Sequence, residues 1–416
     1  MKLLFYGESA FNPTGFGNVN KHLLAACAEV CEVTHVATTH YHMGHDREEY
    51  PWDIVPCPDV SPEERTPTHQ RNVANIEHWV KEGEWDIFFY QGDMGWNNDV
   101  LEWVRARCEG DPHKHSIFYM PIDGDISLPH AFSVFTWASA PVVYTHHARS
   151  VVARYQPEIA ENISVIWLGC EPDVFYPLSR EERRACRVKF FGEAYADRFI
   201  VLNVNRNQAR KDLMRSIAAH HEFHKRHPDS TLMLHSVVND VGGNLPFMAQ
   251  LLGCDIYSQP SEVAFSSLDL AAPWSRSDLN RLYNACDVLI STAHGEGWGL
   301  TTTEAMSAGL PVVVPANTAN LDSVGSREER GHLVRMGGDL DHTVFTYHQG
   351  NAACSIIHLD SFLEKLECVY SNRVGAMMKA QRAREWAVAN SWEVRKNEWK
   401  QLLTLMRVSS MSTIAS

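Results

Sequence analysis

The stretch from Cys286 to Val314 most constrains how this chain can fold, because it predicts a strand, a glycine-rich loop, a helix and a second strand in close succession. The apolar run from Val288 to Ser291 is typical of a buried parallel strand. A helix is expected to begin near Leu300, and Gly309 suits the position just after its end. Leu310 to Val314 then resumes a buried strand. This order of elements predicts an α/β domain with a parallel sheet.

The loop and the helix start carry residues suited to binding an anion. Gly295, Gly297 and Gly299 let the backbone approach a ligand closely. The first amide groups of the helix and its dipole favour negative charge at the same place. Glu296 lies in the loop and Glu304 in the second helical turn. Either carboxylate alone is most simply a surface acid or a complement to the helix dipole. Together with the glycines, they predict a ligand with both phosphate and hydroxyl groups.

This stretch resembles the donor-site signature of the retaining GT-B glycosyltransferases of family 4, in which paired glutamates flank a Gly-aromatic-Gly-Leu run. The resemblance implies that Glu296 contacts hydroxyl groups of a donor sugar. It implies that Glu304 holds the ribose hydroxyls of a nucleotide. It also implies that one run of backbone holds the diphosphate: Gly297, Trp298, Gly299 and Leu300.

A basic loop earlier in the chain fits the same interpretation. Phe199 to Val204 reads as a buried strand, and a helix is expected from Leu213 to His224. Between them, Arg206 and Lys211 match the Arg and Lys that clamp the donor diphosphate in the family. Two fixed cations can neutralise a leaving group without a metal. The resemblance therefore implies a nucleotide-sugar substrate and no cofactor or metal, although a solvated basic loop is the alternative.

The first strand, Lys2 to Gly7, is followed by a loop and by a helix expected from Asn18 to Val30. Gly15 and Gly17 lie in that loop. A dinucleotide-binding fingerprint is rejected, because Asn20 stands where the third glycine of that motif is needed. The two glycines are predicted either to neighbour the donor phosphates, as the resemblance implies, or to be turn residues.

Polar residues at one strand end and one histidine group complete the candidates. Asp123 follows the predicted strand from His115 to Met120, and the carboxyl ends of strands line the ligand crevice in open α/β sheets. Asp123 is therefore predicted to be functional, with turn chemistry as the alternative. The group His40, His42 and His45 is not predicted to bind a metal, because no cysteine or carboxylate pattern completes a known spacing.

The charge balance and the cysteine spacing indicate which binding partners and which cellular compartment to expect. Residues 1–150 hold 10 basic and 21 acidic side chains, within a chain of net charge −14. Such a balance disfavours a nucleic-acid or anionic-lipid surface. The ten cysteines form no Cys-x-x-Cys pair, which favours reduced thiols in the cytoplasm. No apolar run approaches the length of a membrane span.

The resemblance covers about residues 1–405 and implies an α/β, GT-B architecture: two doubly wound, Rossmann-like domains facing across a cleft. Four segments are expected: an acceptor-side domain over 1–178, a nucleotide-sugar-binding domain over 179–385, a helix crossing back to the first domain over 386–408, and a disordered tail over 409–416.

The implied function is that of a hexosyltransferase that moves a sugar, with retention, from a UDP- or GDP-linked donor to an acceptor hydroxyl. The acceptor is expected to be a glycan, a small molecule or a protein. Three alternatives stay open: transfer to a hydroxymethylated base in DNA, an epimerase or phosphorylase of the same fold, and a non-catalytic glycan- or nucleotide-binding module.

Overall fold

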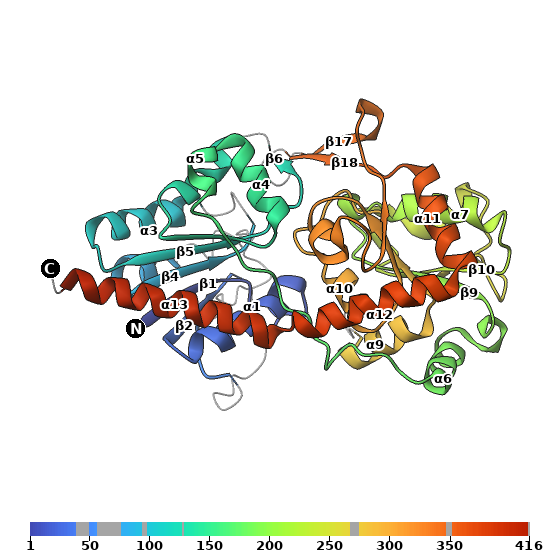
Figure 1. Ribbon diagram of the computed structural model, residues 1–416, viewed down its shortest axis with the longest axis horizontal. Helices are drawn as coiled ribbons and strands as arrows, with labels where there is room; N and C mark the ends of the chain where they lie inside the picture. Colours follow the sequence, from blue (N-terminus) through green and yellow to red (C-terminus); the bar gives the residue numbers. More distant parts are fainter. Residues whose placement is uncertain are drawn as a thin grey trace, which may run out of the picture. The chain divides into compact units, whose positions relative to one another are not determined.

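A computed structural model describes residues 1–38, 50–55, 76–93, 98–126, 129–266, 274–346 and 352–414 (Figure 1). The chain divides into two compact units. Unit 1 comprises Met1–Gly169, Tyr347–Ala352 and Trp392–Ser416, and unit 2 comprises Cys170–Thr346 and Ala353–Ser391. The boundary thus falls at Gly169, nine residues before the expected one at 178. The histidine group at 40, 42 and 45 lies outside the described residues.

Unit 1 is built on a parallel sheet with the strand order β3-β2-β1-β4-β5-β7-β8. The order reverses between β1 and β4, which is the mark of a doubly wound sheet. The described strands are β1 (Lys2–Gly7), β2 (Glu32–Ala37), β3 (Asp53–Val55), β4 (Ile87–Gln91), β5 (His115–Met120), β6 (Asp125–Ile126), β7 (Ala140–Val143) and β8 (Ser164–Val165). The helices are α1 (Gly15–Ala28), α3 (Asn98–Gly110), α4 (His146–Tyr155), α5 (Pro157–Ala160) and α13 (Trp392–Ile414), with a 3-10 helix at Pro129–Thr136.

Helix α1 begins three residues earlier than expected. The hydroxyl of Thr14 accepts a hydrogen bond from the amide of Gly17 at 3.1 Å and caps the helix. Gly15 and Gly17 are therefore helical residues. A Cβ on Gly17 would lie 2.3 Å from the carbonyl oxygen of Asn12, so only glycine allows the turn before the helix to pack this closely.

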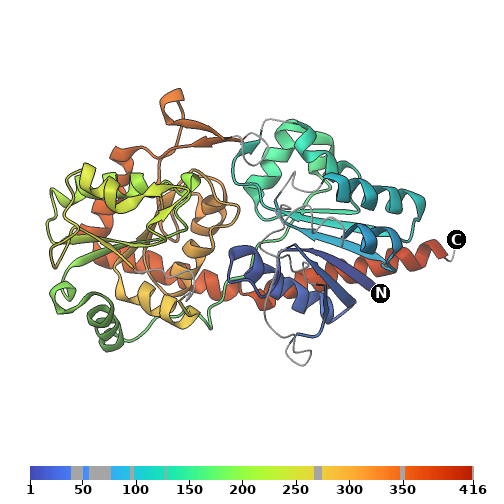
Figure 2. The ribbon, with the colours of Figure 1, turned by 180° about the vertical axis from the view of Figure 1, so that it is seen from behind.

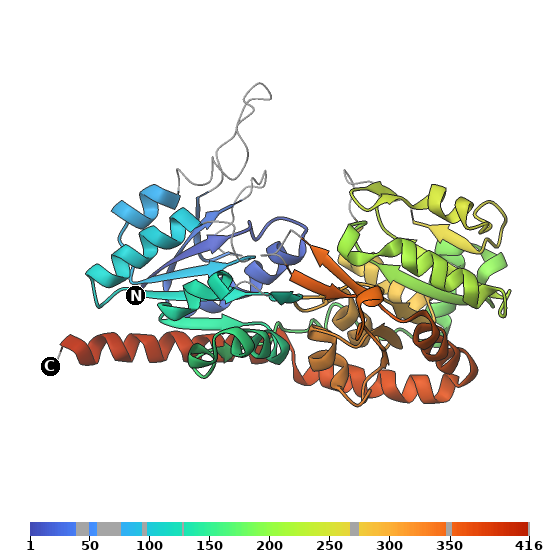
Figure 3. The same cartoon turned by 90° about the horizontal axis from the view of Figure 1, so that it is seen from above.

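Helix α13 is part of unit 1 and contributes to its core. The side chain of Trp399 is fully buried, and its ring lies 5.1 Å from that of Phe89 and 4.7 Å from that of Tyr119. Near the start of the helix, the ring of Trp392 stacks on His22 of α1 at 4.5 Å. The layers are visible in Figure 3, where α3 and α13 lie on opposite faces of the sheet. The helix continues to Ile414, through residues that the sequence predicts to be a disordered tail.

Unit 2 has a second parallel sheet, with the strand order β13-β10-β9-β14-β15-β16. Its strands are β9 (Phe199–Val204), β10 (Ser230–His235), β13 (Val263–Phe265), β14 (Val288–Ile290), β15 (Val312–Pro315) and β16 (His332–Val334), beside the short strands β11 (Asn239–Asp240), β12 (Gly243–Asn244), β17 (Thr343–Thr346) and β18 (Ala352–Ser355). The helices are α6 (Arg180–Phe191), α7 (Leu213–His224), α8 (Leu245–Leu251), α9 (Arg276–Ala285), α10 (Leu300–Ser307), α11 (Leu359–Ser371) and α12 (Arg373–Ala389). Short helical turns occur at Glu193–Tyr195, Ala209–Lys211, Leu321–Gly325 and Leu340–His342.

Strand β9 separates two hydrophobic cores in unit 2. Phe199 and Val201 pack with α7, α8 and α11, whereas Ile200 and Leu202 pack with α9 and α10 on the other face. This alternation is the period of two expected of a strand, and every residue of β9 is buried because both faces are covered. Figure 2 shows α7 and α9 on opposite sides of the sheet.

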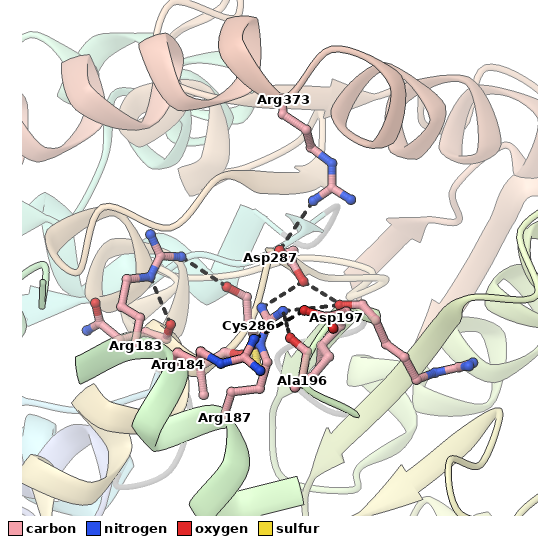
Figure 4. A network of polar contacts seen from close by, with 12 residues as sticks. Arg183, Arg184, Arg187, Ala196, Asp197, Cys286, Asp287 and Arg373 are labelled. Atoms are coloured by element: carbon pink, nitrogen blue, oxygen red, sulfur yellow. Dashed lines mark hydrogen bonds and ion pairs between the residues drawn. The ribbon is translucent and has the colours of Figure 1, made fainter. Parts of the chain in front are cut away.

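A network of hydrogen bonds and ion pairs lies at the amino ends of β9 and β14 in unit 2 (Figure 4). The carboxylate of Asp287, just before β14, accepts hydrogen bonds from the amide of Ile200 at 2.8 Å and from the guanidinium of Arg187 at 2.9 Å. Arg373 of α12 lies 3.2 Å from the other carboxylate oxygen. Arg183 of α6 donates to the carbonyl oxygens of Asn284 and Cys286. These contacts join α6, α12 and the amino ends of β9 and β14.

Among the described residues, no helix is both long and apolar enough to cross a membrane.

Candidate active site

The strand, loop, helix and strand predicted between residues 286 and 314 are confirmed as β14, α10 and β15. Helix α10 begins after Gly299, which has a φ of +82° and supplies no side chain to cap the first amide groups. The helix ends at Ser307, and Gly309, two residues later, has a φ of +71°. The amide of Leu310 then donates a hydrogen bond to the carbonyl oxygen of Ala305 at 2.9 Å. The start of α10 therefore presents backbone donors and the positive end of a helix dipole.

Glu296 is buried in the loop before α10 and lies between two cations. One carboxylate oxygen accepts a hydrogen bond from the ammonium of Lys211, and the other lies 3.3 Å from the guanidinium of Arg210. Arg210 also donates to the carbonyl oxygen of Gly295. The hydroxyl of Thr318 accepts a hydrogen bond from the amide of Glu296 at 2.9 Å. The structure therefore brings together Glu296, predicted to contact the donor sugar, and Lys211, predicted to bind the diphosphate.

The two cations keep Glu296 ionised. Burial by itself would raise the pKa of the Glu296 carboxyl, but the charges and hydrogen bonds of Lys211 and Arg210 outweigh burial and hold that pKa below its ordinary value. A fixed, ionised carboxylate accepts hydrogen bonds and donates none, so it suits a ligand that presents hydroxyl groups.

Arg206 lies on the same loop but has a different partner. Its guanidinium is mostly exposed and pairs with the carboxylate of Asp240 at 2.8 Å. Arg210, which the sequence analysis did not single out, is the arginine beside Glu296. The reason is local geometry: Ala209–Lys211 forms one 3-10 turn, so Arg210 and Lys211 point from the same turn toward the loop of Glu296.

The turn that carries Arg210 and Lys211 is held in place by three residues that carry no recognisable sequence signal: Asp212, Thr292 and His294. Asp212 has a φ of +46°, an uncommon conformation for a residue other than glycine, and its side chain caps α7. Its carboxylate lies 3.0 Å from the imidazole of His294. The hydroxyl of Thr292 donates to the carbonyl oxygen of Asp212 at 2.8 Å. The turn that carries Arg210 and Lys211 is thereby tied to the segment after β14.

Glu304 lies on α10 and is partly buried. Its carboxylate accepts a hydrogen bond from the hydroxyl of Tyr283 at 2.7 Å. Burial raises the pKa of Glu304 to about 7, although Tyr283 and the charge of Arg276 act in the opposite direction. Arg276 itself is paired with Glu171. The pKa values of Glu296 and Glu304 are thus shifted in opposite directions, because Glu296 has two adjacent cations whereas burial dominates at Glu304.

Asn320 is a further site residue that the sequence analysis missed. Its side chain is buried, and neither of its polar atoms has a hydrogen-bond partner among the described residues. Its oxygen would lie 3.7 Å from a Cβ placed on Gly299. A buried amide without partners is costly, so this side chain is a candidate ligand-binding group at the glycine loop. Trp298 in that loop turns its ring inward, where it is buried and 6.5 Å from the ring of Trp386.

The remaining predicted site residues lie in unit 1. Asp123 follows β5 and is buried, as its predicted position at a strand end requires. Gly15 and Gly17 occupy the first turn of α1. Asp125, two residues beyond Asp123, is paired with Arg154 of α4.

Sequence comparison finds one family in this region. Residues 270–340 match the family described as "Glycosyl transferases group 1". The match contains the loop of Glu296 and the whole of α10. No curated protein sequence matches the chain.

Solved structures match nearly the whole chain. Sucrose-phosphate synthase from Thermosynechococcus elongatus has a TM-score of 0.73 and 15% identity, covering 98% of this chain and 100% of that one. HepE from Anabaena, in complex with UDP-glucose, has a TM-score of 0.66 and 15% identity, covering 97% and 99%. WaaG, a glycosyltransferase involved in lipopolysaccharide biosynthesis, has a TM-score of 0.66 and 15% identity, covering 97% and 100%. The chain therefore has the GT-B fold, with two parallel-sheet α/β domains, and its residues 270–340 are of the group 1 glycosyltransferase type.

Proposed function

Because the chain has the GT-B fold and a segment of the group 1 glycosyltransferase type, we propose that it transfers a sugar from a nucleoside diphosphate sugar to an acceptor hydroxyl. The observation that carries the proposal is the pairing of Glu296 with Lys211 and Arg210 beside the uncapped start of α10. This arrangement places fixed positive charge, backbone donors and an ionised hydrogen-bond acceptor around one loop. A donor with a diphosphate and a hydroxylated sugar needs all three.

Catalysis in this proposal rests on stabilising the departing diphosphate. The amides from Gly297 to Leu300 and the cations of Lys211 and Arg206 would hold it, and charge that develops on the leaving oxygen would meet a field that is already in place. We propose that the sugar is transferred with retention at its anomeric carbon and without a metal or another cofactor. The acceptor hydroxyl would pass its proton to the leaving phosphate, so no enzymic nucleophile takes part.

In this proposal three side chains bind the hydroxyl and polar groups of the donor: Glu296, Glu304 and Asn320. Glu296 accepts hydrogen bonds from sugar hydroxyls and Glu304 from the ribose. Asn320, next to Gly299, would find its hydrogen-bond partners on the donor. We propose a UDP-linked hexose as the donor, since HepE has been crystallised with UDP and UDP-glucose. Asp123 in unit 1 stays a prediction for sugar or acceptor contact.

The first experiment measures thermal stabilisation by UDP, GDP, ADP and their sugar conjugates. Stabilisation grows with the ratio of free ligand to its dissociation constant. UDP is expected to stabilise the wild type and to lose most of this effect in Arg206→Ala. Arg335→Ala is a matched control, because Arg335 is equally exposed and also forms an ion pair, with Asp360. If none of the nucleotides shifts the wild type, the donor-site assignment fails and a glycan-binding module becomes the better hypothesis.

A turnover assay then tests catalysis through Glu296. With UDP-sugar and candidate acceptors, Glu296→Gln is expected to lower turnover by about 100-fold or more. The control is Glu328→Gln, because Glu328 also binds two lysines, Lys365 and Lys379, in a partly buried position. Turnover that survives Glu296→Gln would contradict the assignment. Donor conversion without an acceptor would instead indicate an epimerase, and a requirement for inorganic phosphate would indicate a phosphorylase.

A further inference from the structure

A histidine, a cysteine and a glutamate meet in unit 2 at a place that the proposed transfer does not use. His221 lies on α7, Cys254 lies three residues after α8, and Glu262 directly precedes β13. The imidazole Nδ1 of His221 lies 2.7 Å from Oε1 of Glu262 and 3.5 Å from Sγ of Cys254. The three potential ligand atoms all lie within 4.8 Å of one another.

The cluster is largely enclosed and held by its surroundings. Cys254 and Glu262 are buried, and the side chain of His221 is about one-fifth exposed. The second carboxylate oxygen of Glu262 accepts a hydrogen bond from the amide of Asp255 at 3.3 Å, and the amide of Glu262 donates to the carbonyl of Asp255 at 2.9 Å. These bonds fix the carboxylate with one oxygen directed at the other two residues. Such supporting bonds are typical of residues around a metal ion.

We propose that His221, Cys254 and Glu262 bind one divalent cation of the zinc type, with the fourth position open to water. One nitrogen, one sulfur and one oxygen ligand form a donor set that zinc accepts in tetrahedral geometry, whereas magnesium and calcium take oxygen ligands. Usual zinc–ligand lengths place the sulfur and nitrogen of such a site roughly 3.5 Å apart. The observed separation of Cys254 and His221 matches that value.

Binding changes the protonation of the cluster in a defined way. The thiol of Cys254 is buried beside Glu262 and His221. The cation replaces the S–H bond with an S–metal bond, and the proton leaves to solvent. Nδ1 of His221 then offers its lone pair to the cation, with the ring proton on Nε2. The hydrogen bond between His221 and Glu262 is replaced by two bonds to the ion.

The site is separate from the candidate active site. Glu262 precedes the amino end of β13, whereas the loops of Lys211 and Glu296 follow the carboxyl ends of β9 and β14. In a parallel sheet the amino ends of the strands and their carboxyl ends lie at opposite ends of the sheet. A bound ion would join α7, the segment after α8 and the edge strand β13, so its role is to stabilise the fold. The inference is therefore independent of the proposed sugar transfer.

A second group of ligand types gives an internal comparison. Asp339, His342 and His358 also lie close together, but they include no thiol. Asp339 is exposed and accepts a hydrogen bond from the amide of His342, which caps a short helix. The imidazole of His358 donates a hydrogen bond from Nε2 to the carbonyl oxygen of Gly337 at 2.7 Å. Local hydrogen bonds account for this group, so it serves as the control position.

The test is a cobalt(II) titration of the full chain, read by absorbance, followed by competition with zinc. We expect one equivalent to bind with a thiolate-to-cobalt charge-transfer band, and zinc to remove that band. Cys254→Ser should abolish the band and weaken zinc binding at least tenfold. Cys368→Ser, which removes an exposed thiol, and His342→Gln should leave both unchanged.

Thermal melting in the presence of a chelator shows whether each variant folds. If Cys254→Ser does not fold, Glu262→Gln is used in its place. Zinc should raise the melting temperature of the wild type and of the two controls only. The proposal is overturned if the wild type shows no thiolate band, if the band survives Cys254→Ser, or if His342→Gln removes it. Stabilisation by nucleotides is measured on the same samples, so a failure of the metal site is distinguishable from a failure of the donor site.

Discussion

The pKa values of two glutamates eight positions apart are shifted in opposite directions by their surroundings. Glu296 has Lys211 and Arg210 against its carboxylate, which lowers its pKa in spite of burial. Burial raises the pKa of Glu304 to about 7 in spite of the hydrogen bond from Tyr283. Divergent pKa values in one site are typical of functional carboxylates. The same two residues are the pair that the sequence motif predicts.

The raised pKa of Glu304 predicts a pH-dependent contribution to stability. Between the ordinary value of 4.5 and about 7, the folded chain holds a proton that the unfolded chain releases. The contribution is therefore fully present below pH 4.5 and is lost as pH rises toward 7. Urea unfolding of the wild type should show a free energy of unfolding that falls across this range relative to Glu304→Gln. Identical pH slopes in the two proteins would contradict the assignment.

Among single residues, the sequence predicts those of the glutamate motif but not the residues that hold them in place. Glu296 and Glu304 are predicted from the glycines around them and from the family resemblance, and Lys211 is predicted from that resemblance alone. Arg210 could not, since only the 3-10 turn directs it at Glu296 rather than into solvent. Asp212 and His294 are far apart in the chain, and their contact depends on the order of β9 and β14 in the sheet.

Strands were predicted closely in both units, whereas the first helix of unit 1 was not. Strand β9 and helix α7 have the predicted bounds, because a buried apolar run and an amphipathic repeat are strong local signals. Helix α1 begins earlier than predicted, because the hydroxyl of Thr14 caps it and Gly15 and Gly17 are helical. Glycine is a poor helix former in general, but here a Cβ would collide with the preceding turn.

The network around Asp287 predicts a large effect from a small substitution. Asp287→Asn removes the charge that is shared by Arg187 and Arg373, which leaves Arg187 partly buried without its counter-ion. We expect the free energy of unfolding to fall by about 2 kcal/mol or more. Urea titration of Asp197→Asn is the control, since Asp197 is almost fully exposed beside Arg184 and should change stability by less than about 0.5 kcal/mol. Equal effects in the two variants would mean that the network does not stabilise unit 2.

The molecule consists of two units. A substitution in the hydrophobic core of unit 1 is therefore expected to lower the stability of that unit. Trp399→Ala should destabilise unit 1 by about 3–5 kcal/mol, because a fully buried ring that packs on β4 and β5 is removed. Leu405→Ala, on an exposed position of the same helix, should have little effect. Scanning calorimetry provides the measurement. A loss in Trp399→Ala no larger than that in Leu405→Ala would show that α13 is not part of the core of unit 1.

The doubly wound architecture of each unit is what the family resemblance implies, and the parallel strand orders of both sheets confirm it. The division of the chain was harder to predict. The boundary at Gly169 and the continuation of α13 to Ile414 depend on long-range packing, for which no local pattern gives a signal.

The place of α13 in the chain sets an order of events during synthesis. Strands β1 to β8 leave the ribosome first, yet the ring of Trp399 that fills their core is added more than two hundred residues later. The elements of unit 2 emerge in between, with both faces of their sheet covered by helices of their own. The nascent chain should therefore complete its second domain before its first. Until the residues of α13 have been synthesised, the apolar surface of unit 1 that α13 covers remains open to chaperones.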